Sequence, residues 1–434
     1  MSIEVIVMFA ILFGLLASGL WIGLTLALTG TVLLFLFRSM PLDRLLPQYA
    51  WNILTTQELL ALPLFILMGE LLFRTHLSRS LFKGLAPWAG LLPGRLLHVN
   101  VFGCTIFAAI SGSSAATTQV VGRIALTELL KRGYSKDIAI GSLAGAGTLG
   151  FLIPPSNIMI IYGVLGDVSI LKLFTAGFIP GFLLAGTFMA WVMIHTTLRG
   201  DLVPQAENDL RNLSWRERFS ALRDLAPALF LILCVLGSMY GGIATPSEAA
   251  AVGVLGAALV TAFQGSLNFE AIKGILIGSV ITCSMIALIV LGASILGNAA
   301  AFLGIPQAVA AFVKGLNLTP FMLIVALIAF YIVLGCFLDG FSMIVMTLPI
   351  VLPIVKQAGF DPIWFGVFMV LVVEMAQITP PVGFNLFVIQ GLTGDGLGYI
   401  AKVTFPYLVI LILFTLLLTV YPEIVLWLPK VLAG

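Results

Sequence analysis

A pair of adjacent prolines interrupts one of the most apolar stretches of this 434-residue chain. Pro154 and Pro155 lie within residues 147–166, GTLGFLIPPSNIMIIYGVLG. They remove two backbone donors, and their rings clash with the preceding helical turn, so a continuous helix cannot pass easily. The carbonyl groups freed at such a break need partners other than water if they lie in lipid. Broken helices are tolerated at membrane depth where they line a cavity or bind an ion.

The same feature returns 226 residues later, at Pro380 and Pro381 within residues 374–395, EMAQITPPVGFNLFVIQGLTGD. Pro180 and Pro406 are separated by the same offset. The chain therefore reads as two halves of one duplicated unit. Corresponding interrupted apolar segments in two halves point to the binding site of a transporter. The alternative is that both breaks are only kinks in packing helices.

The composition indicates a bilayer as the solvent of this chain. Hydrophobic residues make up 60% and charged residues 9% of the sequence, whereas about 25% of a soluble domain is charged. The few charges lie in short loops without a basic stripe, so no nucleic-acid partner is expected. Four cysteines and three histidines show no metal or redox spacing. No cofactor is expected.

The pattern of apolar runs predicts an all-α polytopic membrane protein with two inverted repeats, residues 1–198 and 225–434, joined by a polar cytoplasmic linker at 199–224. Each repeat is expected to have five crossings, counting one broken helix, and one re-entrant hairpin. In the first repeat we expect crossings at 3–17, 20–37, 51–73 and 170–198, a hairpin at about 98–130 and a broken helix at about 136–166. In the second we expect crossings at 225–243, 246–264, 271–300 and 400–428, a hairpin at about 319–356 and a broken helix at about 361–392. The segments 74–97 and 301–317 are expected to lie at the membrane interface.

The distribution of Lys and Arg predicts the orientation. An odd number of crossings inverts the second repeat relative to the first. This arrangement places most of the 21 Lys and Arg residues on the side of the linker, which the positive-inside rule assigns to the cytoplasm. Both termini are therefore expected outside the cytoplasm. The first hairpin then enters from the cytoplasm and the second from outside.

Several motifs of the chain resemble a known family. They are GSSAATT at 112–118, KRGYS at 131–135, GTLGFLIPPSNIMIIYG at 147–163, GFIPG at 177–181, LDGFSMIVMTLPIVLP at 338–353 and EMAQITPPVGFNLFVIQG at 374–391. In order and spacing these segments look like the large membrane subunit of the tripartite ATP-independent periplasmic (TRAP) transporters. The resemblance implies a sodium-driven importer of organic acids in a bacterial or archaeal inner membrane, working as an elevator. It also implies two partners, a small four-helix membrane subunit and a periplasmic substrate-binding protein.

The resemblance places a sodium site in each half, where unwound carbonyls and hydroxyls supply the oxygen ligands that this ion prefers. The expected first site joins the hairpin tip to the first helix break through Ser113, Ser114, Gly147, Thr148 and Gly150. The expected second site joins the other tip to the second break through Asp339, Thr379, Pro380 and Gly383. Asp339 stands where the first half has Ser113, so the two sites can differ in affinity. The alternative for each serine is a small residue that lets helices pack closely.

The substrate is expected between the two hairpin tips, where half-helix N-termini offer free amides to a carboxylate. The candidate ligands are Ser114, Thr117, Asn157, Asn385 and Arg123. Arg123 has an alternative role as a helix-end cation that pairs with Glu128 or extends toward the interface. The acids Glu70, Glu248 and Glu374 lie in or near apolar spans, and structural pairing is the favoured interpretation for them.

Three other functions are less consistent with these patterns. A stand-alone divalent anion–sodium symporter uses a related two-hairpin architecture, but the proline-containing motifs look more like the TRAP pattern. A membrane enzyme needs clustered His, Asp or Glu side chains, or a nucleophile with a base, and no such cluster is evident. Duplicated broken helices suit alternating access better than the continuous pore of a channel.

Overall fold

The computed structural model describes residues 3–38, 41–73, 77–204, 213–264, 268–316, 318–381 and 383–433, which contain helices and no strand. Among these residues, six helices are long and apolar enough to cross a membrane. They are α10 (Ile170–Leu198), α12 (Trp215–Tyr240), α13 (Pro246–Phe263), α14 (Phe269–Phe302), α17 (Gly340–Gln357) and α20 (Leu397–Val420). Five of them match expected crossings, whereas α17 lies in the segment expected to form the second hairpin. The other expected crossings consist of shorter or bent helices, so the count of five per repeat stays a prediction.

The first two helices have the bounds that the sequence predicts, and the third span differs. α1 (Ile3–Ala17) and α2 (Ile22–Phe37) match their expected ranges. The expected crossing at 51–73 is wrong in its start, because α3 (Leu42–Leu54) begins within the polar segment before it. A bend of 54° then separates α3 from η1 (Gln57–Leu60) and α4 (Ala61–Phe73).

Two threonines explain where α3 ends. The hydroxyl of Thr55 donates to the carbonyl of Trp51 at 2.6 Å, and that of Thr56 donates to the carbonyl of Asn52 at 2.9 Å. Thr56 itself is extended, with φ −60° and ψ 126°. Hydroxyls that bond to nearby backbone groups compete with helix continuation, so the chain turns at this point.

Two helix pairs lie where the sequence predicts the re-entrant hairpins. α6 (Leu97–Ser111) and α7 (Ser114–Lys131) pack against each other and are joined through Gly112, whose φ of +57° suits glycine. α16 (Pro320–Gly335) and α17 are joined by residues 336–339. Both tips lie within the expected ranges.

Both proline pairs coincide with helix breaks. α8 (Lys136–Gly147) continues into η2 (Thr148–Gly150), and α9 (Asn157–Gly166) follows after the prolines. α18 (Pro362–Gln377) is separated from α19 (Phe384–Thr393) in the same way. The peptide bond within each proline pair is cis.

Two other expected boundaries are wrong. α12 begins at Trp215, inside the expected linker, because Ser214 and Glu217 form a capping box there. The expected crossing at 400–428 is two helices, α20 and α21 (Glu423–Ala433). Tyr421 precedes a proline and has φ −120° and ψ 69°, outside helical geometry.

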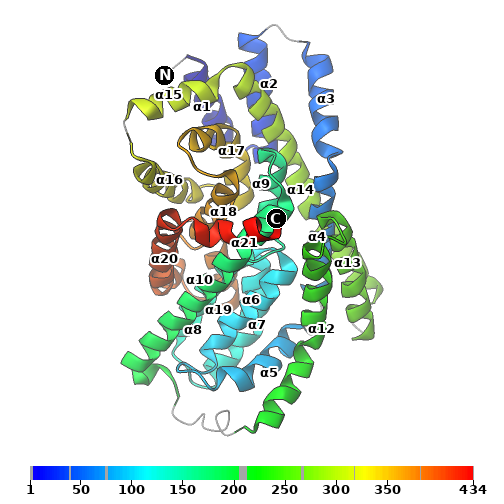
Figure 1. The fold of residues 1–434 in the computed structure, drawn as a ribbon, viewed down its shortest axis with the longest axis vertical. Helices are drawn as coiled ribbons and strands as arrows, with labels where there is room; N and C mark the ends of the chain where they lie inside the picture. The colour runs from blue at the N-terminus through cyan, green and yellow to red at the C-terminus, as the bar shows by residue number, and fades with distance from the viewer. Residues whose placement is uncertain are drawn as a thin grey trace.

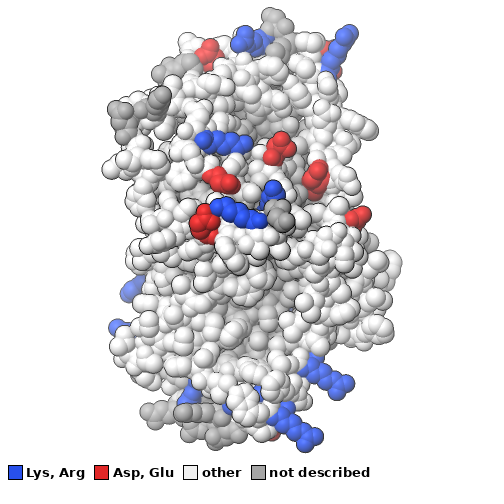
Figure 2. Space-filling model, in the orientation of Figure 1, with Lys and Arg blue, Asp and Glu red and all other residues white. Residues whose placement is uncertain are grey.

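The remaining short helices lie near the ends of longer ones. α5 (Leu77–Ala89) and α15 (Ile305–Gly315) fall within the two segments expected at the interface, and η3 (Gly200–Leu202) follows α10. In Figure 2, Lys and Arg gather at the end of the molecule where α10 ends and α12 begins. Most of the surface between the charged regions is uncharged in this view.

Helices of the two halves pack against one another throughout the molecule (Figure 1). α7 contacts α19, α8 contacts α20, and α9 contacts α17. α14 lies along α2, and α13 lies along α4. The α2–α14 contact is close, since a Cβ on Gly292 would come within 2.2 Å of the Gly23 carbonyl oxygen. The hairpins and broken helices therefore pack together, and the α2–α14 and α4–α13 pairs contact them through α14–α17 and α4–α6.

Candidate functional site

Ser114 lies at the centre of a buried polar cluster that joins four helices. Its Oγ is 2.9 Å from the carbonyl oxygen of Gly147, 2.8 Å from Glu374 Oε2 and 2.7 Å from Asn385 Nδ2. These residues come from the start of α7, the end of α8, the last turn of α18 and the start of α19. The side chains of Ser114, Glu374 and Asn385 have no exposed surface. We call Ser114, Gly147, Glu374 and Asn385 the Ser114 junction.

Glycines at the helix break make this approach possible. A Cβ on Gly150 would lie 2.4 Å from Ser114 Cα, and one on Gly147 would lie 2.0 Å from Thr118 Oγ1. A Cβ on Gly112 would lie 2.7 Å from the carbonyl oxygen of Pro155. The hairpin tip therefore rests directly on the backbone of the broken helix.

Glu374 ties the hairpin tip and the helix break to the second half of the chain. Its Oε2 accepts from the Ser114 hydroxyl, and its Oε1 accepts from the backbone N–H of Phe151 at 2.8 Å. Both donors are uncharged. Sequence reasoning treated Glu374 as a structural acid and did not include it among the site residues. The available signal was an acid at the end of an otherwise apolar run, six residues before Pro380.

The structure brings four of the five expected first-site residues together. Ser114 bonds to the Gly147 carbonyl, and a Cβ on Gly150 would lie 2.4 Å from Ser114 Cα and 2.7 Å from the Ser113 carbonyl oxygen. Ser113 is the N-cap of α7, and its Oγ accepts from the Ala116 N–H at 3.4 Å. The Thr148 hydroxyl donates within its own turn, to the Gly145 carbonyl at 2.6 Å.

The expected substrate residues separate into two groups. Ser114 and Asn385 are in the junction, Thr117 Oγ1 lies 3.0 Å from Ser111 Oγ on the same tip, and the Asn157 N–H donates to the Gly112 carbonyl at 3.3 Å. The buried Oδ1 atoms of Asn157 and Asn385 have no hydrogen-bond partner. Arg123 is exposed and follows Ser114 by nine residues, which is about 13 Å along α7. The described contacts of the junction do not include it.

Asp339 occupies the second hairpin tip as the N-cap of α17. Its carboxylate accepts from the Phe341 N–H at 3.1 Å, the Ser342 N–H at 3.5 Å and the Ser342 hydroxyl. The residue is half-buried. A carboxylate at this helix N-terminus is stabilised by the free amides and the helix dipole.

The second tip contacts the second break through different groups. Cys336 Sγ donates to the carbonyl of Pro380 at 3.3 Å, and a Cβ on Gly383 would lie 2.9 Å from the carbonyl oxygen of Thr379. The Thr379 hydroxyl donates to the Met375 carbonyl at 2.7 Å. Thr379, Pro380 and Gly383 thus lie at one break, as expected, but among the described residues no hydrogen bond or ion pair joins them to Asp339.

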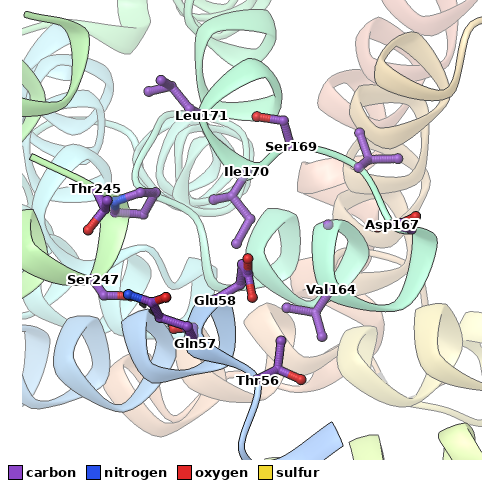
Figure 3. A pocket seen from close by; sticks show the side chains of 13 residues that line it. Thr56, Gln57, Glu58, Val164, Asp167, Ser169, Ile170, Leu171, Thr245 and Ser247 are labelled. Atoms are coloured by element: carbon purple, nitrogen blue, oxygen red, sulfur yellow. Dashed lines mark hydrogen bonds between the residues drawn. The ribbon is translucent and has the colours of Figure 1, made fainter. Parts of the chain in front are cut away.

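A cavity of about 450 Å³ lies where η1 and the α12–α13 turn face the α9–α10 turn (Figure 3). Glu58 and Asp167 line it together with hydroxyl residues such as Thr56 and Ser169. None of the expected site residues lines this cavity. It is therefore a separate hollow between the packed group of broken helices and the neighbouring α4–α13 pair.

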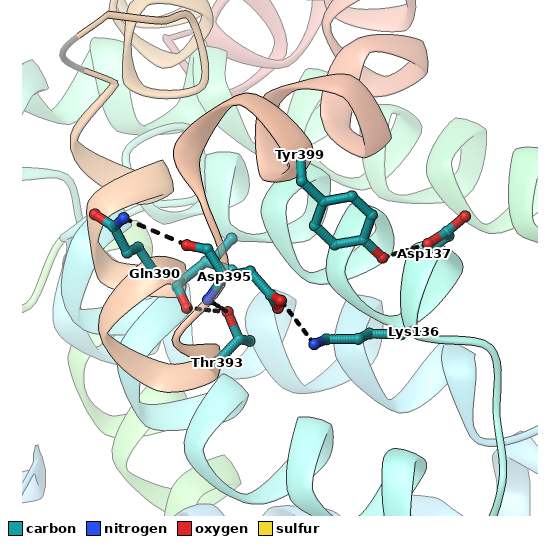
Figure 4. A network of polar contacts seen from close by, with 7 residues as sticks. Lys136, Asp137, Gln390, Thr393, Asp395 and Tyr399 are labelled. Atoms are coloured by element: carbon teal, nitrogen blue, oxygen red, sulfur yellow. Dashed lines mark hydrogen bonds and ion pairs between the residues drawn. The ribbon is translucent and has the colours of Figure 1, made fainter.

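A polar network joins the start of α8 to the α19–α20 turn (Figure 4). Lys136 Nζ lies 2.7 Å from Asp395 Oδ1, and the hydroxyl of Tyr399 donates to Asp137. The hydrogen bond from Lys136 holds the pKa of Asp395 below its usual value. The network links the two broken-helix units at the end remote from α9.

The comparison with protein families shows the family to which this chain belongs. Residues 9–424 match the model of the DctM component of the tripartite ATP-independent periplasmic transporters. The chain belongs to this family.

Individual TRAP relatives match the chain along nearly its whole length. It is 34% identical to the C4-dicarboxylate TRAP transporter large permease protein DctM of Pseudomonas aeruginosa, over 94% of each chain. It is 29% identical to the sialic acid TRAP transporter large permease protein SiaM of Vibrio cholerae, over 97% of each chain. The fold is similar to that of the Alcanivorax borkumensis YdaH transporter, with a TM-score of 0.56, 14% identity and coverage of 94% and 96%.

Membership in the TRAP family confirms the resemblance seen in the sequence motifs. The protein is a multi-pass membrane protein and the large permease component of a transporter that depends on a substrate-binding protein. Large permeases of this family work with a small membrane subunit and a periplasmic binding protein. The relatives are permeases, which fits a non-enzyme.

Proposed function

We propose that this chain is the sodium-coupled permease of an importer for an organic acid that a periplasmic binding protein delivers. The Ser114 junction is the observation that supports the proposal most directly. It gathers hydroxyl, carbonyl and carboxylate oxygens at a helix break, deep in the protein. Oxygen ligands from unwound backbone are the usual setting for Na⁺ in secondary transporters. Asp339 and the second break offer a second such setting.

The packing supports an elevator movement in which the hairpins and broken helices move as one group. α7 packs with α19, α8 with α20 and α9 with α17, so the broken helices and hairpin arms of one half contact those of the other half. The α2–α14 and α4–α13 pairs form the stationary part, and the cavity in Figure 3 lies at the boundary. The protein lies in an inner membrane with both termini in the periplasm.

An organic acid is the proposed substrate because both named relatives are permeases for organic acids, a C4-dicarboxylate and sialic acid. The start of α9 contacts the first hairpin tip, because the Asn157 N–H donates to the Gly112 carbonyl next to the start of α7. The positive ends of the two helix dipoles at this break favour a carboxylate. Asn157 and Asn385 each retain a buried oxygen without a partner. These groups can accept from a hydroxyl or amide on the same substrate.

Reconstituted transport tests the proposal. The chain and its small membrane subunit are placed in liposomes, the binding protein is added outside, and uptake of radiolabelled succinate and sialic acid is measured with an inward sodium gradient. Uptake should require both the gradient and the binding protein. Equal uptake with potassium in place of sodium would remove sodium coupling. Uptake by the chain alone would identify a stand-alone anion–sodium symporter.

A further inference from the structure

Glu374 is a buried carboxylate whose recorded contacts provide no counter-charge. It has no exposed surface and lies between Val373 and Met375, which are also fully buried. Its two hydrogen bonds come from the Ser114 hydroxyl and the Phe151 N–H. An ionised carboxylate is costly in such surroundings unless a cation or a proton compensates it.

The Ser114 hydroxyl also faces more acceptor oxygens than its one proton can serve. The Ser114 hydroxyl has a single proton, yet it faces two acceptors, the Gly147 carbonyl and Glu374 Oε2. Asn385 Nδ2 donates to the same Oγ and supplies nothing to either acceptor. The single hydroxyl proton can therefore serve only one of these two acceptors at a time. Asn385 Oδ1, fully buried beside it, is a further oxygen without a partner.

We propose that Glu374 supplies the carboxylate of a sodium site at the Ser114 junction, with Ser114 Oγ and the Gly147 carbonyl oxygen as its other ligands. This inference rests on the sodium coupling proposed above. A sodium ion balances the buried charge and binds the acceptor oxygen that the hydroxyl proton does not serve. The ligand set is made of oxygens, as hard cations require.

The assignment changes how the two candidate sites compare. From the sequence alone, the second hairpin tip was expected to supply a carboxylate ligand, Asp339, and the first tip only serine hydroxyls. With Glu374, each site has one carboxylate, and that of the first site comes from the other half of the chain. Sodium binding at Ser114 thereby ties α7 and α8 to α18.

The test compares Glu374→Gln with wild type in the purified complex. The amide keeps the size of the side chain and hydrogen-bonding groups on both arms, but it removes the charge. We expect the sodium affinity of this site, measured with radiolabelled Na⁺, to fall roughly 10- to 100-fold. Residual binding should disappear when Asp339→Asn is added. Glu128→Gln is the matched control, because Glu128 lies on α7 near its exposed end and pairs with Arg132.

Thermal unfolding separates a ligand from a structural group. Sodium should raise the melting temperature of wild type by preferential binding to the folded state. In Glu374→Gln this increment should shrink, while the melting temperature in choline should be no lower than that of wild type. An equal loss in sodium and choline, or an unchanged sodium increment, overturns the assignment and leaves sodium coupling intact. No sodium response in wild type overturns both proposals.

Wild-type protein provides a second measurement if the variant does not fold. An apolar carbodiimide enters the membrane and modifies buried carboxyl groups, and the product at Glu374 is measured by mass spectrometry. Sodium should protect Glu374 relative to choline at constant pH. Equal modification in both salts means that a proton, and not sodium, compensates the carboxylate, and this result contradicts the assignment.

Discussion

Gly150 lies against Ser114 so closely that a Cβ on Gly150 would be 2.4 Å from Ser114 Cα. The nearest atoms are backbone atoms of the α7 N-terminus, which cannot move aside as a flexible side chain can. The contact holds the first hairpin tip on the first helix break. It also fixes the position of the Ser114 hydroxyl relative to the Gly147 carbonyl.

We therefore expect Gly150→Ala to separate the tip from the break. Overpacking of this kind costs about 1–3 kcal/mol, so the melting temperature of the purified protein should fall. Sodium affinity should fall with it, because the junction oxygens no longer converge. Gly186→Ala on α10 is the control, since no atom lies within 4 Å of its added Cβ. Equal effects of the two substitutions on sodium affinity would contradict a specific role for the Gly150 contact.

The Lys136–Asp395 pair predicts a pH dependence of stability. The pKa of Asp395 is lowered in the folded protein, mainly by the hydrogen bond from Lys136. Its contribution is therefore full above the unfolded pKa of about 3.9 and is lost as pH falls through the lower folded pKa. The pair is partly exposed, so its effect is at most about 1 kcal/mol.

The measurement is the melting temperature of wild type and Asp395→Asn as a function of pH. Wild type should be the more stable protein above the unfolded pKa, and the difference should shrink in more acidic solution. Glu423→Asn is the control, because its pair with Lys430 is more exposed. A wild type that is less stable than Asp395→Asn above the unfolded pKa, and that gains stability relative to it in acid, would show that the charged pair destabilises the folded protein.

Much of the helix pattern could be predicted from the sequence because prolines and glycines mark helix ends within apolar runs. The bounds of α10 and both helix breaks follow directly from such signals. The bend at Thr55 and the early start of α12 depend on local hydroxyl and capping interactions, which hydrophobicity does not show. Tyr421 was missed because a single Pro422 near a chain end resembles an ordinary kink.

The site could be predicted only in part, for a different reason. Ser114 and Gly147 belong to one half, and the motifs at its hairpin tip and helix break predicted that these two residues lie close together. Glu374 and Asn385 reach Ser114 from the other half, at separations of 260 and 271 residues. Asn385 was expected with Ser114 among the substrate residues, whereas the position of Glu374 depends on how the two halves pack, for which one sequence gives no signal.

Topology can be tested through the segment 205–212, which lies outside the described residues. In a variant without the four native cysteines, single cysteines placed in this segment should react only with reagents that cross the membrane. A tag after Gly434 should be accessible from the periplasm. The excess of Lys and Arg on the linker side gives the physical reason. Labelling of the segment by an impermeant reagent in intact cells would overturn the inverted-repeat orientation.

Asp339 should control the proposed second sodium site, and its cap contacts indicate which substitutions separate a sodium role from a capping role. The carboxylate caps α17 through the N–H groups of Phe341 and Ser342. Asp339→Ala removes both the charge and the cap, so it should raise the sodium concentration for half-maximal transport and cost about 0.5–2 kcal/mol of stability. Asp339→Asn retains a capping oxygen, so it should raise the sodium requirement with a smaller loss of stability.

Two comparisons make the Asp339 prediction specific. Ser113→Ala, at the corresponding position of the first tip, should raise the sodium requirement less, because a neutral hydroxyl attracts a cation less strongly than a carboxylate does. Glu128→Ala should leave it unchanged, since Glu128 pairs with Arg132 away from both tips. Sodium-dependent uptake by the reconstituted complex, together with melting temperatures, measures both quantities. Normal sodium dependence in Asp339→Asn and Asp339→Ala would leave only backbone and hydroxyl oxygens at the second break as candidates, because Asp339 would then act solely as a helix cap.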